Sequence, residues 1–130
     1  MEIFVKRNKT VEVEVYAWEV EGNVEASHTK EEVPSDKQGE TTILKFRFRR
    51  PGHRDSVEIG KEAQMQSGNP DNMDVISFQD KILRLLLKDW DCNVSDSGGE
   101  SIAMNQKNIG DLQPNIARAA VAGILEKISI

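Results

Sequence analysis

Two stretches in the first half of the chain alternate apolar and polar residues with a period of two. In residues 11–18, three valines and an alanine alternate with two glutamates, a tyrosine and a tryptophan. In residues 42–49, one face carries Thr42, Leu44, Phe46 and Phe48. Successive side chains of a strand point to opposite faces of a sheet, so both stretches predict strands with one face in the core. Residues 2–6 predict a further strand, which turns at residues 7–10.

An antiparallel pairing of these two strands would bring charges of opposite sign together. Glu12 and Glu14 lie on the polar face of the first strand, and Lys45 and Arg47 lie on the polar face of the second. Cross-strand charge pairs of this kind contribute roughly 0.2–1 kcal/mol each. The pattern therefore predicts that much of the positive charge in this region stabilises the sheet.

The stretch between the two strands, residues 21–40, has a different composition. It is rich in Gly, Glu, Ser, Lys and Pro, and it has few large apolar residues. Such a segment supplies little surface to a core and is typical of connections between elements. The sequence predicts a long mobile connection here rather than a packed element.

The second half of the chain changes to a helical period. A Pro-Gly pair at residues 51–52 ends the strand, and Asp55 or Ser56 can cap a short helix that runs to about Gln66. Residues 67–71, with the sequence SGNPD, then break this helix. The pattern thus predicts a short first helix and a turn after it.

A longer helix is predicted from about Asp74 to about Asp89. Its apolar residues recur at spacings of three and four, and they are Val75, Phe78, Ile82, Leu85 and Leu86. Leu83, Leu87 and Trp90 widen this stripe beyond what one neighbouring layer usually covers. Two interpretations follow: this is the central core helix, or its second side contacts a partner, which includes a second copy of the chain.

The last predicted helix opens with Pro114, a residue well suited to the first helical position, behind Asp111 or Gln113 as a cap. Its apolar seam contains Ile116, Ala117, Ala120, Val121, Ile124, Leu125 and Ile128. The small residues in this seam permit close approach, so we expect the two long helices to pack together.

Together these patterns predict one α+β domain over residues 1–130. An N-terminal antiparallel sheet of two to three strands would pack with about three C-terminal helices. Residues 1–50 are predicted to be mainly β, apart from the mobile connection, and residues 51–130 mainly helical. A chain of 130 residues buries enough surface to support such a core without metal or disulfide.

Charge and cysteine content narrow the function classes. The chain has 22 acidic and 17 basic residues, and its net charge of −5 disfavours general attraction to nucleic acid or anionic membranes. No apolar run is long enough to span a bilayer, so we expect neither export nor membrane insertion. Cys92 is the only cysteine, which excludes an internal disulfide and is compatible with a reducing cytoplasm. We expect it to be a partly buried apolar residue rather than a reactive thiol.

The acidic turn over residues 89–100 has the spacing of a calcium-binding loop. Positions 1, 3, 5, 7 and 12 of an EF-hand correspond to Asp89, Asp91, Asn93, Ser95 and Glu100. However, Val94 stands where the sharp turn needs glycine, and Asp96 stands where such loops carry an inward apolar residue. The sequence favours an ordinary turn rich in Asp, Asn and Gly, with a bound cation as the alternative.

Catalytic motifs are absent from the sequence. His28 lies in the predicted connection and His53 in a turn, and no motif links either histidine to a nucleophile. The chain has neither a Gly-rich phosphate loop nor the spacing of metal-ligating histidines and cysteines. We therefore expect a protein that is not an enzyme and that uses no cofactor and no metal.

A basic stripe interleaves with two aromatic residues and consists of Lys45, Arg47, Arg49, Arg50 and Arg54. Single-stranded nucleic acids bind to such mixtures through base stacking and phosphate neutralisation. Strand alternation counts against this function, because it turns Phe46 and Phe48 into the core and the charges toward water or the two glutamates. A nucleic-acid-binding accessory protein is therefore the second alternative for this chain.

Five short motifs lie in the last two-thirds of the chain. They are FRFRRP at 46–51, LLLKDWD at 85–91, GGE at 98–100, NQKNI at 105–109 and LQP at 112–114. In this order the chain resembles the small tail assembly chaperones of tailed bacteriophages. None of the motifs is catalytic.

The resemblance implies a non-enzymatic protein in the cytoplasm of the infected bacterial host. Such chaperones bind the long tape-measure protein and keep it soluble until tail-tube subunits assemble around it, and they often occur in a second, frameshifted longer form. Another tail protein is the alternative partner. A structural or decoration component of the virion is the alternative function.

Partner-binding residues can be predicted from the mode of recognition. A tape-measure protein exposes long apolar helices, and a groove for such a helix uses Leu, Met and aromatic side chains. Leu83, Leu87 and Trp90 are the first candidates, and Met65 and Met104 are further ones because Met adapts to varied partners. A place in the core is the alternative for each of them.

Overall fold

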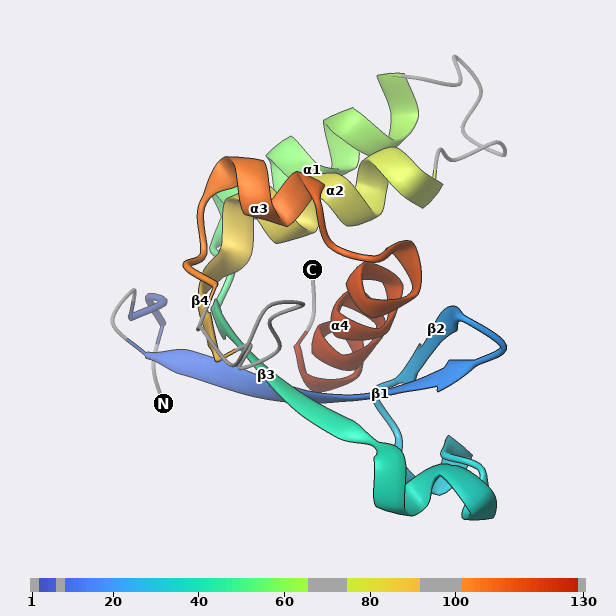
Figure 1. Cartoon of the computed structure of the whole chain (residues 1–130). Helices are drawn as coiled ribbons and strands as arrows, with labels where there is room; N and C mark the ends of the chain where they lie inside the picture. Colours follow the sequence, from blue (N-terminus) through green and yellow to red (C-terminus); the bar gives the residue numbers. More distant parts are fainter. Residues whose placement is uncertain (1–2, 7–8, 66–74, 92–101, 129–130) are drawn as a thin grey trace.

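The computed structural model describes residues 3–6, 9–65, 75–91 and 102–128, with the backbone alone for residues 62–65. It contains a four-stranded antiparallel sheet in the order β2-β1-β3-β4, with helices on one side (Figure 1). The strands are β1 Thr10–Val20, β2 Asn23–Ser27, β3 Thr42–Arg49 and β4 Leu87–Asp91. The α-helices are α1 His53–Met65, α2 Val75–Leu86, α3 Gln106–Gly110 and α4 Pro114–Lys127. The α+β class is confirmed, but the described sheet has four strands rather than two to three, and the described residues after 51 form four α-helices rather than about three.

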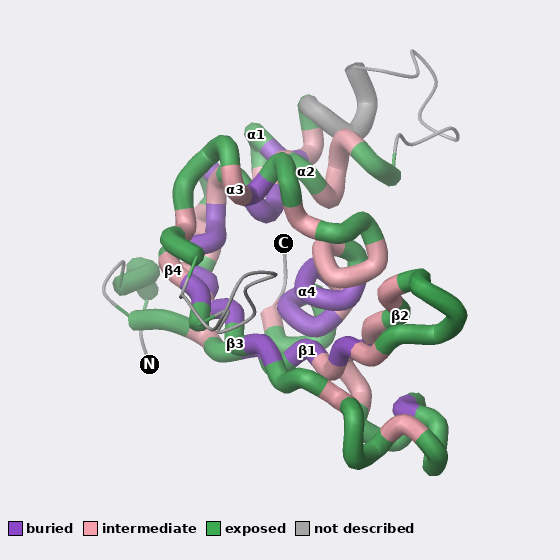
Figure 2. Tube along the Cα trace, viewed as in Figure 1, coloured by how far each residue is buried: buried purple, intermediate pink, exposed green. Residues whose placement is uncertain are grey.

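The helices cover one face of the sheet. α4 lies across β1 and β2, and α2 contacts both α4 and β4. α1 packs on α2, and α3 contacts α2 as well. Figure 2 shows the buried positions on the inner sides of α4 and the central strands, where helix and sheet meet. The predicted packing between the two long helices, α2 and α4, is confirmed.

The predicted pairing of the first two strands is also confirmed. β1 and β3 run antiparallel with Glu12 opposite Arg47 and Glu14 opposite Lys45. The other face of both strands enters the core, where the two phenylalanines of β3 are fully buried. The alternation therefore gave the buried face of each strand, because each strand has one apolar side and one charged side, and the structure adds the register.

The prediction of an unpacked connection over residues 21–40 is wrong. This segment contains β2 and two 3₁₀ helices, η1 Lys30–Glu32 and η2 Ser35–Glu40. β2 pairs with β1 through a two-residue turn at Glu21 and Gly22, whose φ angles are 51° and 83°. Positive φ at both positions gives a turn whose twist matches that of the paired strands. The composition concealed this strand because its inward side carries only a valine and an alanine.

The long helix is shorter than the periodicity predicted. α2 ends at Leu86, and the chain continues directly as β4, which pairs with β3. In that pairing Trp90 lies opposite Phe46, and Leu87 lies opposite Phe48. Pairing with β3 and burial of two large side chains outweigh the local helical pattern, since tertiary packing decides most helix stability. The wide stripe is therefore not one helix with two apolar faces.

Two smaller expectations also need correction. α1 begins at His53, two residues before the nearer predicted cap, and Asp55 lies in its first turn. The Asp55 carboxylate accepts a hydrogen bond from the backbone N–H of Gly52 at 2.9 Å. The described residues 3–6 form no strand, so the predicted N-terminal strand is wrong for them.

Candidate functional site

A half-open cavity of about 590 Å³ lies among the described residues. It opens between the inner face of the sheet and the segment that joins α3 to α4. Its apolar lining includes Ala17, Val24, Leu44, Leu112 and Ile116. A volume of this size falls within the roughly 300–1,000 Å³ that is typical of ligand pockets. The cavity can therefore accept a few apolar side chains.

Trp90 lines this cavity, and two contacts hold its indole ring in place. Its indole N–H donates a hydrogen bond of 2.7 Å to the backbone carbonyl of Ile102, and both residues line the cavity. The ring meets Phe46 edge to face, with centroids 6.1 Å apart and an interplanar angle of 86°. Such pairs contribute about 0.5–1.5 kcal/mol beyond the area that they bury. The wall is therefore preorganised by one hydrogen bond and one ring contact.

Asparagine side chains hold other parts of the backbone around the cavity. Asn105 caps α3, because its side-chain oxygen accepts a hydrogen bond of 2.8 Å from the N–H of Asn108. The side-chain amide of Asn108, a lining residue, donates to the carbonyl of Ala103 at 2.7 Å. At the start of α4, Asn115 donates to the carbonyl of Val24 at 2.9 Å and ties the helix to β2. These bonds hold the backbone around the cavity.

The rim of the cavity is acidic. Glu19, Glu40 and Asp111 line it and are exposed, and the described lining includes neither lysine nor arginine. Lys37 lies 3.6 Å from Glu40, and Lys107 lies 2.9 Å from Asp111. Exposed ion pairs of this kind contribute little and exchange readily. The rim therefore favours a partner whose positive charges flank an apolar segment.

The structure places most of the predicted partner-binding residues in the core. Leu83, Leu87 and Trp90 are 3%, 7% and 8% exposed. All three lie in the core, which was the alternative considered for them, because α2 and β4 turn their side chains inward. Met104 is half-buried against the same core, and the side chain of Met65 lies outside the described residues. Of the four whose side chains the structure describes, Trp90 alone lines the cavity.

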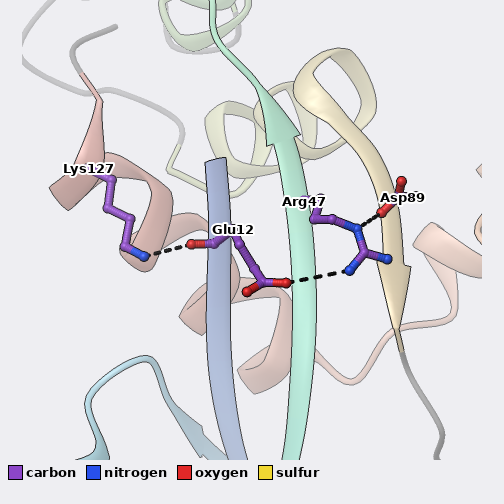
Figure 3. Close-up of polar contacts among 4 residues, drawn as sticks. All are labelled: Glu12, Arg47, Asp89 and Lys127. Carbon is purple, nitrogen blue, oxygen red and sulfur yellow. Dashed lines mark hydrogen bonds and ion pairs between the residues drawn. The ribbon is translucent and has the colours of Figure 1, made fainter. Parts of the chain in front are cut away.

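The basic stripe is largely held by carboxylates of the sheet. Arg47 pairs with Asp89 on β4 through its Nε, and its Nη1 lies 3.5 Å from Glu12 on β1 (Figure 3). Hydrogen bonding to Asp89 is the main reason why the pKa of Arg47 is raised. In the same view, Lys127 of α4 donates to the backbone carbonyl of Glu12 at 2.6 Å. Arg47 therefore links three strands across the outer face of the sheet.

The rest of the stripe divides into structural and exposed positions. Arg49 forms two hydrogen bonds to the Asp55 carboxylate, at 2.6 and 3.0 Å, and these raise the pKa of Arg49. Lys45 lies in register between Glu14 and Asp91, while Arg50 and Arg54 are exposed. A stripe arranged in this way offers little unbalanced positive charge to a phosphate backbone.

The structure also bears on the predicted cation loop and on the two histidines. Asp89 and Asp91 belong to β4, and the remaining positions of the predicted cation loop, like Cys92, lie outside the described residues. Within the described ranges, no group of three or more His, Cys, Asp or Glu side chains could hold a metal ion. His28 Nε2 lies 2.9 Å from the Glu126 carboxylate, and His53 is exposed at the start of α1.

The fold and the cavity define a two-layer α+β protein with a preorganised apolar site. Comparisons with models of known protein families, with curated proteins and with solved structures gave no match. Among the described helices, none is both long and apolar enough to cross a membrane. The cavity itself was not predictable from the sequence, because its lining comes from segments spread between residues 17 and 116.

Proposed function

We propose that this protein is a non-enzymatic assembly chaperone of a tailed bacteriophage, acting in the cytoplasm of the infected bacterium. Its cavity would hold an apolar segment of the tape-measure protein until the tail tube assembles. The observation that carries the proposal is the position of the motif residues. Trp90, Asn108 and Leu112, from three of the five motifs on which the resemblance rests, all line this cavity.

The chemistry of the cavity supports a protein ligand. Its walls are built from aliphatic side chains and Trp90, and its rim carries carboxylates, so it suits a short apolar segment followed by lysine or arginine. A helix laid into a groove buries side chains at spacings of three and four, and the cavity offers room for one such anchor cluster. The balanced charges on the outer face of the sheet favour this function over nucleic-acid binding.

Intrinsic fluorescence provides a direct test. Trp18 and Trp90 are the only two tryptophans, and both line the cavity, so a bound segment changes their emission. Fragments of the tape-measure protein that contain no tryptophan should shift the emission in a saturable way. Trp18→Ala should weaken binding, whereas Ile43→Ser, on the outer face of β3 and 53% exposed, should leave it unchanged.

Co-expression with the complete tape-measure protein tests the chaperone role itself. The wild-type chain should increase the soluble fraction of that protein, and Trp18→Ala should lose part of the increase. If the tape-measure protein is equally soluble with and without this chain, the proposed function is wrong. Mass spectrometry of purified virions separates the alternative, because a structural component would be present there in many copies and a chaperone would be absent.

A further inference from the structure

In the described part of the sheet, residues 18–20 at the end of β1 have a neighbouring strand on one side only. On the β2 side, the pairing continues to Val20, which lies opposite Asn23. On the β3 side, the pairing ends where Ala17 lies opposite Thr42. The chain before Thr42 leaves the sheet as η2, which Figure 1 shows at the lower right, on the side of the sheet away from α4. β1 therefore has an overhang, defined as residues 18–20, with one free edge.

The free edge of the overhang presents the backbone of Glu19. In an antiparallel sheet, successive residues direct their N–H and C=O groups to alternate sides. The pair that flanks a two-residue turn exchanges both hydrogen bonds, so Val20 bonds to β2 and Glu19 faces the opposite side. Ala17 faces β3 in the same way and meets Thr42 there. The described sheet has no strand residue opposite Glu19 on that side, so its N–H and C=O form a template for another strand.

The cavity runs along this free edge. Trp18 and Glu19 are successive strand residues whose side chains point to opposite faces of the sheet, yet both residues line the cavity. Glu40 and Thr42, from the segment that leads into β3, line it as well. Open space therefore separates the overhang from that segment. A strand that continued β3 in this direction would occupy the space.

We propose that the partner segment adds to β1 as a short strand in line with β3 and pairs with the backbone of Glu19. The side chain opposite Glu19 in such a pair points to the same face of the sheet, which is the face of the apolar interior. Basic residues next to it meet the carboxylates of Glu19 and Glu40 at the rim. The occupant is thus an extended segment of another protein, with apolar and basic residues, and its main chain contributes to binding.

This inference rests on the proposed function for the identity of the partner, and it adds how that partner is bound. The apolar anchor inside the cavity and the extended residues that lead to it are consecutive parts of one segment. A segment that binds only through its side chains would leave the backbone of Glu19 unpaired. The N–H of Glu19 therefore distinguishes the two modes of binding.

Amide hydrogen exchange followed by NMR measures this group directly. In the free chain, the N–H of Glu19 should exchange quickly, whereas those of Ala17 and Trp18 are protected by β3 and β2. A saturating tape-measure fragment should slow the exchange of Glu19 about tenfold or more, because its N–H then donates to the added strand. Ala17 and Trp18 are internal references. If a fragment shifts the tryptophan emission but leaves Glu19 in fast exchange, this inference fails and the proposed function stands.

A proline at position 19 removes the donor itself. Glu19→Pro deletes the N–H of the free edge and breaks no bond to β2, and proline is tolerated where a strand N–H faces solvent. Glu19→Ala is the matched control, because it removes the same carboxylate and keeps the N–H. Glu19→Pro should bind the fragment about tenfold more weakly than Glu19→Ala in the fluorescence titration. Circular dichroism of both free variants checks their fold, and the exchange measurement needs neither of them.

Three other results would overturn the inference. The first is equal binding of the fragment by the two folded variants. The second is slow exchange of Glu19 in the free chain, since its edge would then already be paired. If this protection appears only as the protein concentration rises, the occupant is a second copy rather than the partner. The third is a complete lack of response to tape-measure fragments, which would refute the proposed function as well.

Discussion

Gly123→Ala tests whether α4 is seated on the sheet at the closest possible distance. A Cβ built on Gly123 overlaps the Cγ1 atom of Val13 in β1 and lies 3.1 Å from the Cβ of His28. Val13 is 1% exposed in the centre of the sheet, so its side chain has little room to give way, and relief of the overlap would lift α4 from β1. Overpacking of this kind costs typically about 1–3 kcal/mol.

The helix itself would gain from the same substitution. Alanine is about 1 kcal/mol more favourable than glycine in a helix interior, which offsets part of the overpacking. We expect a net loss of up to about 2 kcal/mol in the free energy of unfolding. Gly60→Ala is the matched control, because no atom lies within 4 Å of a Cβ built there and Gly60 also lies inside a helix, α1. That variant should gain about 0.5–1 kcal/mol.

Urea unfolding followed by circular dichroism measures both variants. With a denaturant slope of about 2 kcal/mol per M, the two midpoints should differ by about 1 M, with Gly60→Ala higher. If Gly123→Ala is as stable as Gly60→Ala, the close seating of α4 on β1 is wrong. The comparison cancels the effect of helix propensity, so it isolates the steric term.

Three further predictions concern single side chains. Tyr16 is the only tyrosine, and its hydroxyl donates a hydrogen bond of 3.0 Å to the Glu14 carboxylate, which raises the pKa of Tyr16. The absorbance of the protein at 295 nm should therefore titrate above the ordinary tyrosine value of about 10, and Glu14→Gln should lower the midpoint of that titration. Because the pKa of Tyr16 is higher in the folded state, the contact contributes its full stabilisation below the pKa of the unfolded state, and this stabilisation is lost as pH rises through the folded pKa. If the free energy of unfolding of Glu14→Gln falls in parallel with that of the wild type over this pH range, the contact has no such role. Trp90→Phe loses the hydrogen bond to the Ile102 carbonyl and should cost about 1–3 kcal/mol in thermal or urea unfolding, whereas an unchanged midpoint would deny that bond a role. Asn105→Ala removes the cap of α3 and should cost about 1 kcal/mol by the same measurement, whereas Asn105→Asp, which keeps the capping oxygen, should cost less.

The sequence predicted the two central strands well because their alternation is strict. Each strand buries one side in the core and pairs its charges on the other side, so local pattern and tertiary structure agree. The two edge strands were missed for different reasons. β2 is short and carries few apolar residues, and its only clear signal was the glycine of the two-residue turn, Gly22.

β4 was missed because its apolar residues continue the helical spacing of α2. Leu83, Leu87 and Trp90 fit a period of three and four, yet the last two belong to a strand. A five-residue stretch cannot be assigned to helix or strand by periodicity alone. The partner-binding prediction depended on that assignment, since it counted the same residues as surplus apolar surface. The cavity escaped prediction because it depends on how α3 and α4 are placed over the sheet.

The direct junction between α2 and β4 restricts how this chain can change in length. Leu86 ends the helix and Leu87 begins the strand, with no residue between them to absorb a shift. One inserted residue would either rotate the buried face of the helix by about 100° or exchange the two faces of the strand, which would turn Trp90 outward. Insertions and deletions should therefore be tolerated in the β1–β2 turn far better than at this junction. A scan of single-residue insertions would show the contrast as a loss of folded protein confined to the junction.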